Sequence, residues 1–181
     1  FNQHSGDEVR SAIEDLTKTG AKGFIFDLRD NPGGLLTASV DVTSLFVKDG
    51  VVVTVDGRAP GTDDIYRVNG DKLTDAPLVV LVNENSASSS EIVAGALQDY
   101  KRATTVGVTS FGKGSVQQIE ELSFGGAIKL TIAHYLTPLG RVIDHKGVVP
   151  EVVVKMDAAK QADKTTDLQY QRAITEIRKK L

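Results

Sequence analysis

The chain has 181 residues, of which 40% are hydrophobic and 25% are charged, as in a globular protein with one core of ordinary domain size. Its 21 basic and 24 acidic side chains give a formal net charge of −3, which argues against a protein built to bind nucleic acid. Cysteine is absent from the sequence, so disulfide scaffolds, Cys-ligated metal centres and thiol catalysis are excluded. No apolar run approaches the roughly 18 residues that a membrane-spanning helix needs.

Apolar periodicity in the first half of the chain predicts helices that alternate with strands. In chain order we expect a helix over 7–18 that ends near Gly20, a buried strand over 23–28, a helix over 35–46, a strand over 51–55, and a polar loop or hairpin over 56–75 that turns at Asn69-Gly70. This alternation predicts an α/β layered core with parallel strand pairs.

The second half predicts more strands and a charged tail. We expect strands over 77–82 and 104–108 around a helix over 90–100, a strand pair over 116–122 and 127–136 joined at Phe124-Gly125-Gly126, a turn over 137–140, a short strand over 148–154 and a charged helix over 158–181. The apolar side of that last helix is expected to consist of Leu168, Ala173, Ile174 and Ile177.

A cluster of serines lies where the buried strand 77–82 leads into the next helix. The run from Ser86 to Glu91 contains four serines, and free N–H groups at a helix N-terminus stabilise negative charge beside it. This position suits a nucleophilic serine. Ser88-x-x-Glu91 also matches a helix capping box, and the spacing alone favours that structural role.

A nucleophilic serine needs a base, and histidine is the usual one. The chain has only His4, His134 and His145, and no spacing typical of a metal site. Asp144 precedes His145, but neighbours along a strand point to opposite faces, so this pair is poorly arranged for catalysis. We interpret His134 and His145 as surface histidines or as histidines satisfied by structural contacts.

Lys113 is the second candidate base, because it lies between Gly112 and Gly114 in a loop that can approach other backbone closely. Desolvation can lower a lysine pKa from ~10.4 by ~3 units, and Ser–Lys pairs then replace Ser–His pairs. If residues 114–122 are extended, Lys113 and Gln117 share a face, and the Gln117 amide oxygen can accept from the amine. Composition alone favours a solvated loop lysine.

The Asn31-Pro32-Gly33-Gly34 turn follows the strand 23–28. Backbone N–H groups at such a glycine pair can form an oxyanion hole. The other interpretation is a plain turn into the second helix, in which a glycine supplies a positive φ.

Three blocks in this order together resemble the C-terminal processing peptidases, also called tail-specific proteases. They run from Phe26 to Gly34, from Asn83 to Ile92 and from Phe111 to Gln117, and Tyr135 to Arg141 and Gly147 to Glu151 resemble later blocks of that family. The resemblance covers nearly the whole chain. It implies an α/β fold, a ClpP/crotonase-like layered core of mixed sheet with flanking helices.

The resemblance also implies a serine peptidase with Ser88 as nucleophile, Lys113 as general base and Gln117 as its support, without metal or cofactor. The oxyanion hole would use the backbone N–H groups of Gly34 and Ser89. Ser89 stands where the family usually has alanine, and this change leaves its backbone N–H usable.

For the whole protein, the resemblance implies cleavage of protein or peptide substrates with exposed C-termini, an upstream PDZ domain, and an extracytoplasmic location such as the periplasm, the cell envelope or an organelle lumen. Residues 1–157 would be a catalytic core that lacks its N-terminal part, followed by the charged helix 158–181. The sequence also leaves open whether the protein forms a homo-oligomer.

Two other functions stay open: a hydrophobic-ligand carrier on the same fold, and an inert interaction module. Retention of Ser88, Lys113 and Gln117 together argues against the carrier.

Overall fold

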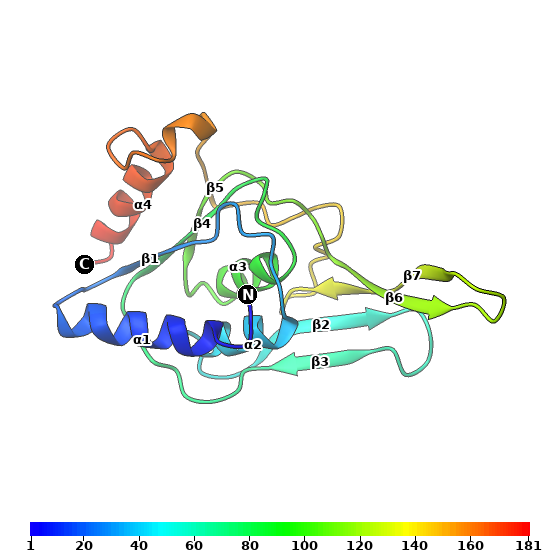
Figure 1. The fold of residues 1–181 in the computed structure, drawn as a ribbon. Coiled ribbons are helices and arrows are strands. Elements are labelled where there is room, and N and C mark those ends of the chain that lie inside the picture. The colour runs from blue at the N-terminus through cyan, green and yellow to red at the C-terminus, as the bar shows by residue number, and fades with distance from the viewer.

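The fold is taken from a computed structural model that describes residues 1–181, apart from the side chain of residue 158. The elements, labelled in Figure 1, are α1 (Ser5–Lys18), β1 (Phe24–Asp27), α2 (Leu36–Ser44), β2 (Val51–Gly57), β3 (Asp64–Arg67), β4 (Leu78–Val82), α3 (Ser89–Asp99), β5 (Thr104–Gly107), β6 (Ser115–Glu121), β7 (Ala127–Leu136), β8 (Val152–Val153), a 3₁₀ turn (Ala158–Lys160) and α4 (Leu168–Arg178). Most of the predicted elements are confirmed within a few residues.

The strands form two sheets. One is parallel, in the order β1-β4-β5-β8, and the other is antiparallel, in the order β3-β2-β7-β6. The expected α/β layered core with flanking helices is therefore confirmed, with its parallel and antiparallel strand pairs in two separate sheets.

The parallel sheet carries the main core because helices cover both of its faces. All five residues of β4 are buried, which explains why that strand is apolar without alternation. Val80 and Val82 pack with α1, α2 and α3, whereas Val79 and Leu81 pack with Ala173 of α4. A second cluster, which includes Val52 and Ile92, joins α2 and α3 to the antiparallel sheet.

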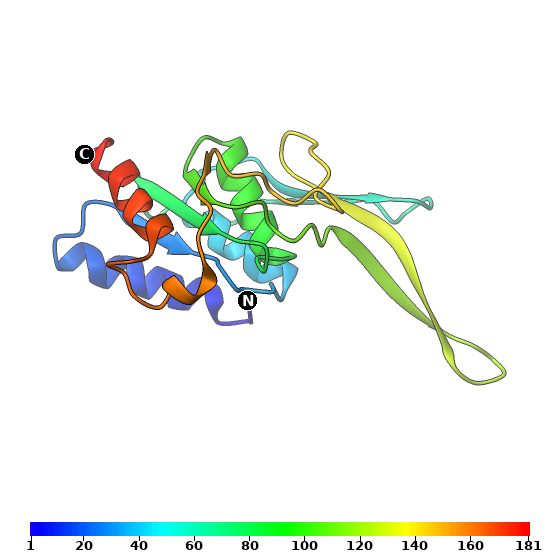
Figure 2. The same cartoon turned by 90° about the horizontal axis from the view of Figure 1, so that it is seen from above.

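The β6–β7 pair extends away from the rest of the molecule as an arm (Figure 2). Its strands pair from Ser115↔His134 to Glu121↔Ala127, with an irregularity between Val116 and Gln117. The predicted turn at Phe124-Gly125-Gly126 is confirmed by a hydrogen bond from Leu122 N–H to the Gly126 carbonyl at 3.0 Å.

The predicted hairpin at Asn69-Gly70 is wrong. The hairpin joins β2 to β3 through residues 58–63, where Asp63 Oδ1 accepts from Gly57 N–H at 2.9 Å. Asn69 follows β3 instead, and its side chain donates to Asp41 Oδ1 at 2.8 Å. This asparagine therefore fastens the loop after β3 to α2.

The C-terminal helix is shorter than the predicted 158–181. Asp163 accepts hydrogen bonds from both the N–H and the hydroxyl of Thr165, which favours a turn. Asp167 then caps α4 by accepting from Tyr170 N–H at 2.9 Å. Leu168, predicted on the apolar side, is 55% exposed, whereas Tyr170, Ala173 and Ile177 face the parallel sheet. None of the helices within the described part of the chain has the length and apolarity to cross a membrane.

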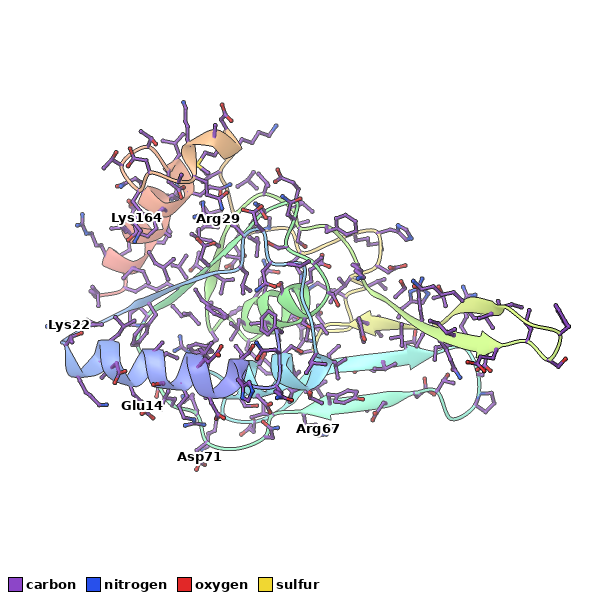
Figure 3. All side chains as sticks on the ribbon, viewed as in Figure 1. Glu14, Lys22, Arg29, Arg67, Asp71 and Lys164 are labelled. Carbon is purple, nitrogen blue, oxygen red and sulfur yellow. The ribbon has the colours of Figure 1, made fainter. Side chains whose placement is uncertain are left out.

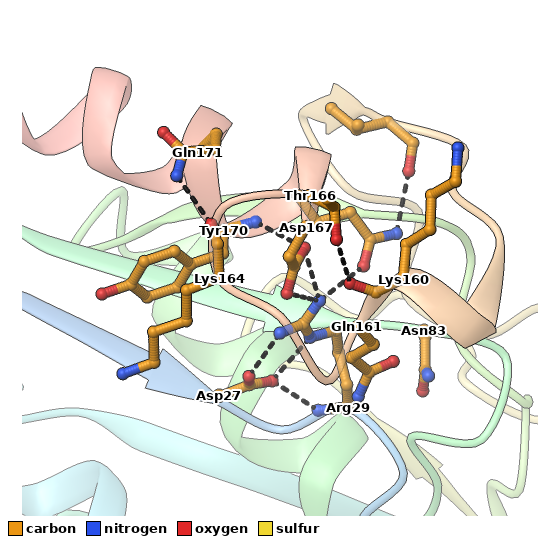
Figure 4. A network of polar contacts seen from close by, with 12 residues as sticks. Asp27, Arg29, Asn83, Lys160, Gln161, Lys164, Thr166, Asp167, Tyr170 and Gln171 are labelled. Atoms are coloured by element: carbon orange, nitrogen blue, oxygen red, sulfur yellow. Dashed lines mark hydrogen bonds and ion pairs between the residues drawn. The ribbon is translucent and has the colours of Figure 1, made fainter.

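A buried arginine fastens the tail to the end of β1 (Figures 3 and 4). The Arg29 side chain is 3% exposed, and its guanidinium lies 2.7 Å from Asp27 Oδ2 and 2.8 Å from Asp167 Oδ2. It also donates to Gln169 Oε1 at 3.1 Å. Burial by itself lowers the pKa of Arg29, but the hydrogen bonds and charges of Asp27 and Asp167 outweigh it and raise the pKa. The tail thus holds Arg29 at the start of the loop that leads to Gly33 and Gly34.

Asp30 is the next residue of that loop and is held at a positive φ of 56°. Its Oδ1 accepts from Asn85 Nδ2 at 2.8 Å and from Asn83 Nδ2 at 2.9 Å, and its Oδ2 accepts from Gln161 Nε2 at 2.7 Å. The bonds from Asn85 and Asn83 are the main reasons that the pKa of Asp30 is lowered. The carboxylate thus ties the loop to two other segments of the chain.

We predict that Asp30→Asn makes the protein less sensitive to acid. Because the pKa of Asp30 is lowered in the fold, its contribution to stability is present above the unfolded pKa of ~3.9 and is lost as pH falls through the folded pKa. Asparagine tolerates a positive φ, so the backbone stays unstrained. Urea unfolding between pH 6 and pH 2 should show the stability difference between wild type and variant narrowing towards acid. Asp71→Asn, at an exposed aspartate, is the control; a difference that stays constant with pH would contradict the prediction.

Candidate active site

Three segments that are far apart in the sequence meet at the N-terminus of α3. They are the β1–α2 loop, the β4–α3 connection and the β5–β6 loop. Ala87 N–H donates to the Asn31 carbonyl at 3.0 Å, and Phe111 N–H donates to the Ser86 carbonyl at 3.0 Å. The serine cluster is thus held between the glycine turn and the segment that carries Lys113.

The four serine hydroxyls of this cluster are not equivalent. Three of them donate to carbonyls of the β1 end or the β1–α2 loop: Ser86 to Leu28 at 2.7 Å, Ser89 to Gly34 at 2.9 Å and Ser90 to Asn31 at 2.9 Å. Within the described structure, Ser88 alone makes no such bond, and it is also the only one of the four that is not fully buried. Ser88 is therefore the one serine of the cluster whose hydroxyl proton is not donated to a loop carbonyl.

The backbone of Ser88 is held in an unusual conformation. As the residue that precedes α3 it has φ 55° and ψ −117°, a combination that non-glycine residues rarely adopt and that clusters at functional sites. Gly33 lies directly against it, because a Cβ on Gly33 would come 2.8 Å from Ser88 Cβ and 2.9 Å from Ser89 N. Only glycine allows this close approach.

Glu91 is fully buried and connects the serine to the lysine loop. Its Oε2 accepts from Ser88 N–H at 2.9 Å and from Lys113 N–H at 2.8 Å. Its Oε1 accepts from the Ser110 hydroxyl at 2.5 Å and from Gly112 N–H at 2.6 Å. The capping box that the spacing predicts is present, but the same carboxylate also binds a second segment, which the sequence analysis missed.

The Glu91 carboxylate is buried although no basic side chain pairs with it. No lysine, arginine or histidine in the described structure forms an ion pair with it. Four donors, together with the positive end of the α3 dipole, offset the loss of hydration. The arrangement is therefore stable only while both segments are in place.

Lys113 lies at the surface, beside a cavity of about 640 Å³ that it lines together with Ser115 and Gln117. The three residues therefore face one space, as their alternation predicts. In the described residues, no hydrogen bond joins Lys113 Nζ to Ser88 Oγ or to Gln117. The structure thus brings the backbones of Ser88 and Lys113 together on one carboxylate oxygen, Glu91 Oε2.

Two backbone N–H groups beside Ser88 are available as an oxyanion hole. Gly33 N–H is used, because it donates to Asn31 Oδ1 at 3.0 Å. Among the described residues, neither Gly34 N–H nor Ser89 N–H donates to a protein acceptor. Phe1 runs alongside this segment, with its carbonyl accepting from Leu35 N–H at 3.0 Å, and a Cβ on Gly34 would overlap that carbonyl.

Asp144 and His145 lie in a turn rather than on the strand that the sequence predicted. Asp144 Oδ2 is 3.3 Å from His134 Nδ1 and 3.5 Å from His145 Nε2, and its Oδ1 accepts from Gly114 N–H at 3.2 Å. Both histidines line the Lys113 cavity, and His145 is a surface residue.

The described structure has no cluster of three His, Asp or Glu side chains that could hold a metal ion.

Comparison with known proteins identifies the family. The sequence profile of peptidase family S41 matches residues 1–154. The chain belongs to peptidase family S41. The S41 match covers all three segments that meet at Ser88.

The relatives are processing proteases. The chain is 45% identical over 176 residues to a carboxyl-terminal-processing protease of Synechocystis, covering 96% of this chain and 41% of the relative. It is 45% identical over 155 residues to carboxyl-terminal-processing peptidase 3, chloroplastic, of Arabidopsis thaliana, covering 84% and 30%. The solved structure of a photosystem II D1 C-terminal processing protease matches with a TM-score of 0.82 at 35% identity, covering 98% of this chain and 46% of that one. The chain thus spans less than half the length of each of these proteins.

We predict that Glu91→Gln strongly destabilises this S41 fold. The amide keeps one acceptor oxygen and turns its NH₂ group towards N–H donors that the carboxylate satisfied, so the free energy of unfolding should fall by about 3–5 kcal/mol. Glu121→Gln, on the exposed arm, is the matched control and should change it by less than about 0.5 kcal/mol. Chemical denaturation measures both, and equal effects of the two substitutions would contradict the role assigned to Glu91.

Proposed function

We propose that the protein containing this chain is a serine endopeptidase that cleaves protein substrates near their C-terminus with Ser88 and Lys113 as its catalytic pair. The observation that carries the proposal is the state of Ser88. Its hydroxyl is the one left free by the loop carbonyls, and its backbone is held at a positive φ beside two unused N–H groups. Membership of family S41 and the similarity to carboxyl-terminal-processing proteases support this reaction.

In the proposed mechanism, neutral Lys113 takes the proton of the Ser88 hydroxyl, and Ser88 Oγ attacks the scissile carbonyl. Gly34 N–H and Ser89 N–H stabilise the oxyanion, a role for which both are unoccupied by protein acceptors. Lys113 then gives the proton to the leaving amine, and water resolves the acyl-enzyme with the same lysine as base.

The Lys113 amine has to reach the Ser88 hydroxyl for these steps. Lys113 is exposed in the structure, and a bound substrate would exclude water from it. Glu91 holds the lysine backbone beside Ser88, so the side chain alone has to move. Gln117, which lines the same cavity, would accept a hydrogen bond from the amine and orient it.

For the whole protein, we propose substrates with exposed C-termini, an upstream PDZ domain that binds those C-termini, and an extracytoplasmic location. The names of the relatives, which include a chloroplastic peptidase, support the substrate class and the location. The cavity beside Lys113 is lined mainly by polar side chains, so it gives no support to a hydrophobic-ligand carrier.

We predict that Ser88→Ala abolishes peptide cleavage by the full-length protein, by about 10⁶-fold, because no other hydroxyl in the cluster is free to attack. The same substitution should remove covalent labelling by an active-site-directed serine reagent, measured by intact mass. Ser90→Ala is the matched control; it deletes a buried hydroxyl that bonds Asn31 and should lower stability while Ser88 stays reactive. Labelling of the Ser88→Ala protein at an unchanged rate would overturn the assignment.

We also predict that Lys113→Arg lowers kcat by about 10²–10⁴-fold with little change in KM, because an arginine keeps the positive charge but cannot act as a base. Lys129→Arg, on β7 outside the cavity, tests for a general effect of lysine replacement. The wild-type pH–rate profile should rise with deprotonation of the base. Near wild-type turnover by Lys113→Arg would exclude the lysine as the base.

A further inference from the structure

The cavity beside Lys113 contains a cation that the proposed mechanism does not use. Arg58, which follows β2, lines this cavity of about 640 Å³ and is exposed, and its backbone N–H is anchored to the Ile132 carbonyl at 2.9 Å. A guanidinium stays protonated at any physiological pH. In the described part of the chain, no carboxylate forms an ion pair with it.

No free negative charge in the cavity neutralises the Arg58 guanidinium. Asp144 is its only carboxylate, and the carboxylate oxygens already face His134, His145 and the N–H of Gly114. Because Arg58 stays charged while Lys113 acts as the neutral base, the cavity favours an anionic group in its occupant.

The chemistry of the proposed reaction determines which part of a substrate lies there. The base that takes the serine proton must give it to the leaving amine, so the leaving fragment lies on the Lys113 side of the scissile bond. Lys113 lines the cavity and Ser88 does not, so the cavity lies on the side of Ser88 where the leaving fragment is expected. In cleavage near a C-terminus, the leaving fragment is the short piece that carries the terminal carboxylate.

We propose that this cavity binds the leaving, carboxyl-terminal fragment of the substrate and that Arg58 recognises a carboxylate on that fragment. The planar guanidinium offers paired donors that match a carboxylate. The carboxylate has two sources: the terminal carboxyl group, once the proposed PDZ domain has released it, or an acidic side chain near it. This inference rests on the proposed function and assigns to Arg58 a role in specificity rather than in the chemical steps.

The test uses the full-length protein and a peptide that the wild type cleaves, in two matched pairs. One pair ends in a free carboxylate or a carboxamide, and the other carries Glu or Gln in the leaving fragment. In each pair, the preference is the ratio of kcat/KM for the carboxylate peptide to kcat/KM for its neutral partner. Arg58→Gln should lower this ratio at least tenfold in one pair, mainly by raising KM for the carboxylate peptide. Arg58→Lys should keep part of that preference.

Arg67→Gln is the matched control, because Arg67 is an exposed arginine on β3 (Figure 3) that does not line the cavity. A lost preference in the first pair assigns the site to the terminal carboxylate, and a lost preference in the second assigns it to an acidic side chain. If both preferences survive Arg58→Gln while Ser88→Ala is inactive, the inference is overturned and the proposed function stands. Cleavage by Ser88→Ala would overturn the proposed function itself.

Discussion

The buried carboxylate of Glu91 is the interaction on which the candidate site depends. It joins the N-terminus of α3 to the loop before β6 by accepting from Ser88 N–H and Lys113 N–H on one oxygen and from Ser110 and Gly112 on the other. A carboxylate without a basic partner is stable in a core only when such donors surround it. The need to satisfy this charge therefore fixes the position of the lysine loop relative to the serine.

The rest of the site follows from close packing around the same helix end. The hydroxyls of Ser89 and Ser90 bind carbonyls of the glycine turn, and Gly33 approaches Ser88 at a distance that excludes any side chain. On the far side of that turn, Arg29 and Asp30 connect it to the C-terminal tail. The chain thus positions Gly34 and Ser89 by bonds that leave their own N–H groups unused.

The sequence predicted those features that depend on local patterns. Apolar runs gave the strands of the parallel sheet, the glycine pair at Phe124-Gly125-Gly126 gave the β6–β7 turn, and the spacing from Ser88 gave the cap of α3. It failed at two loops whose side-chain bonds it did not foresee. Asn69 forms no hairpin turn, because its side chain bonds Asp41, and the α-helix of the tail begins only after Asp167, because Asp163 bonds Thr165 in a turn before it. The second set of Glu91 partners was equally hidden, since 19 residues separate Glu91 from Ser110.

The most direct measurement is a crystal structure of the full-length protein acylated by an active-site-directed serine reagent. The account predicts an ester on Ser88 Oγ, its carbonyl oxygen within hydrogen-bond distance of Gly34 N–H and Ser89 N–H, the Lys113 amine turned towards the ester, and all four Glu91 bonds intact. An acyl group on another residue, or a Lys113 loop released from Glu91 in the acylated protein, would contradict it.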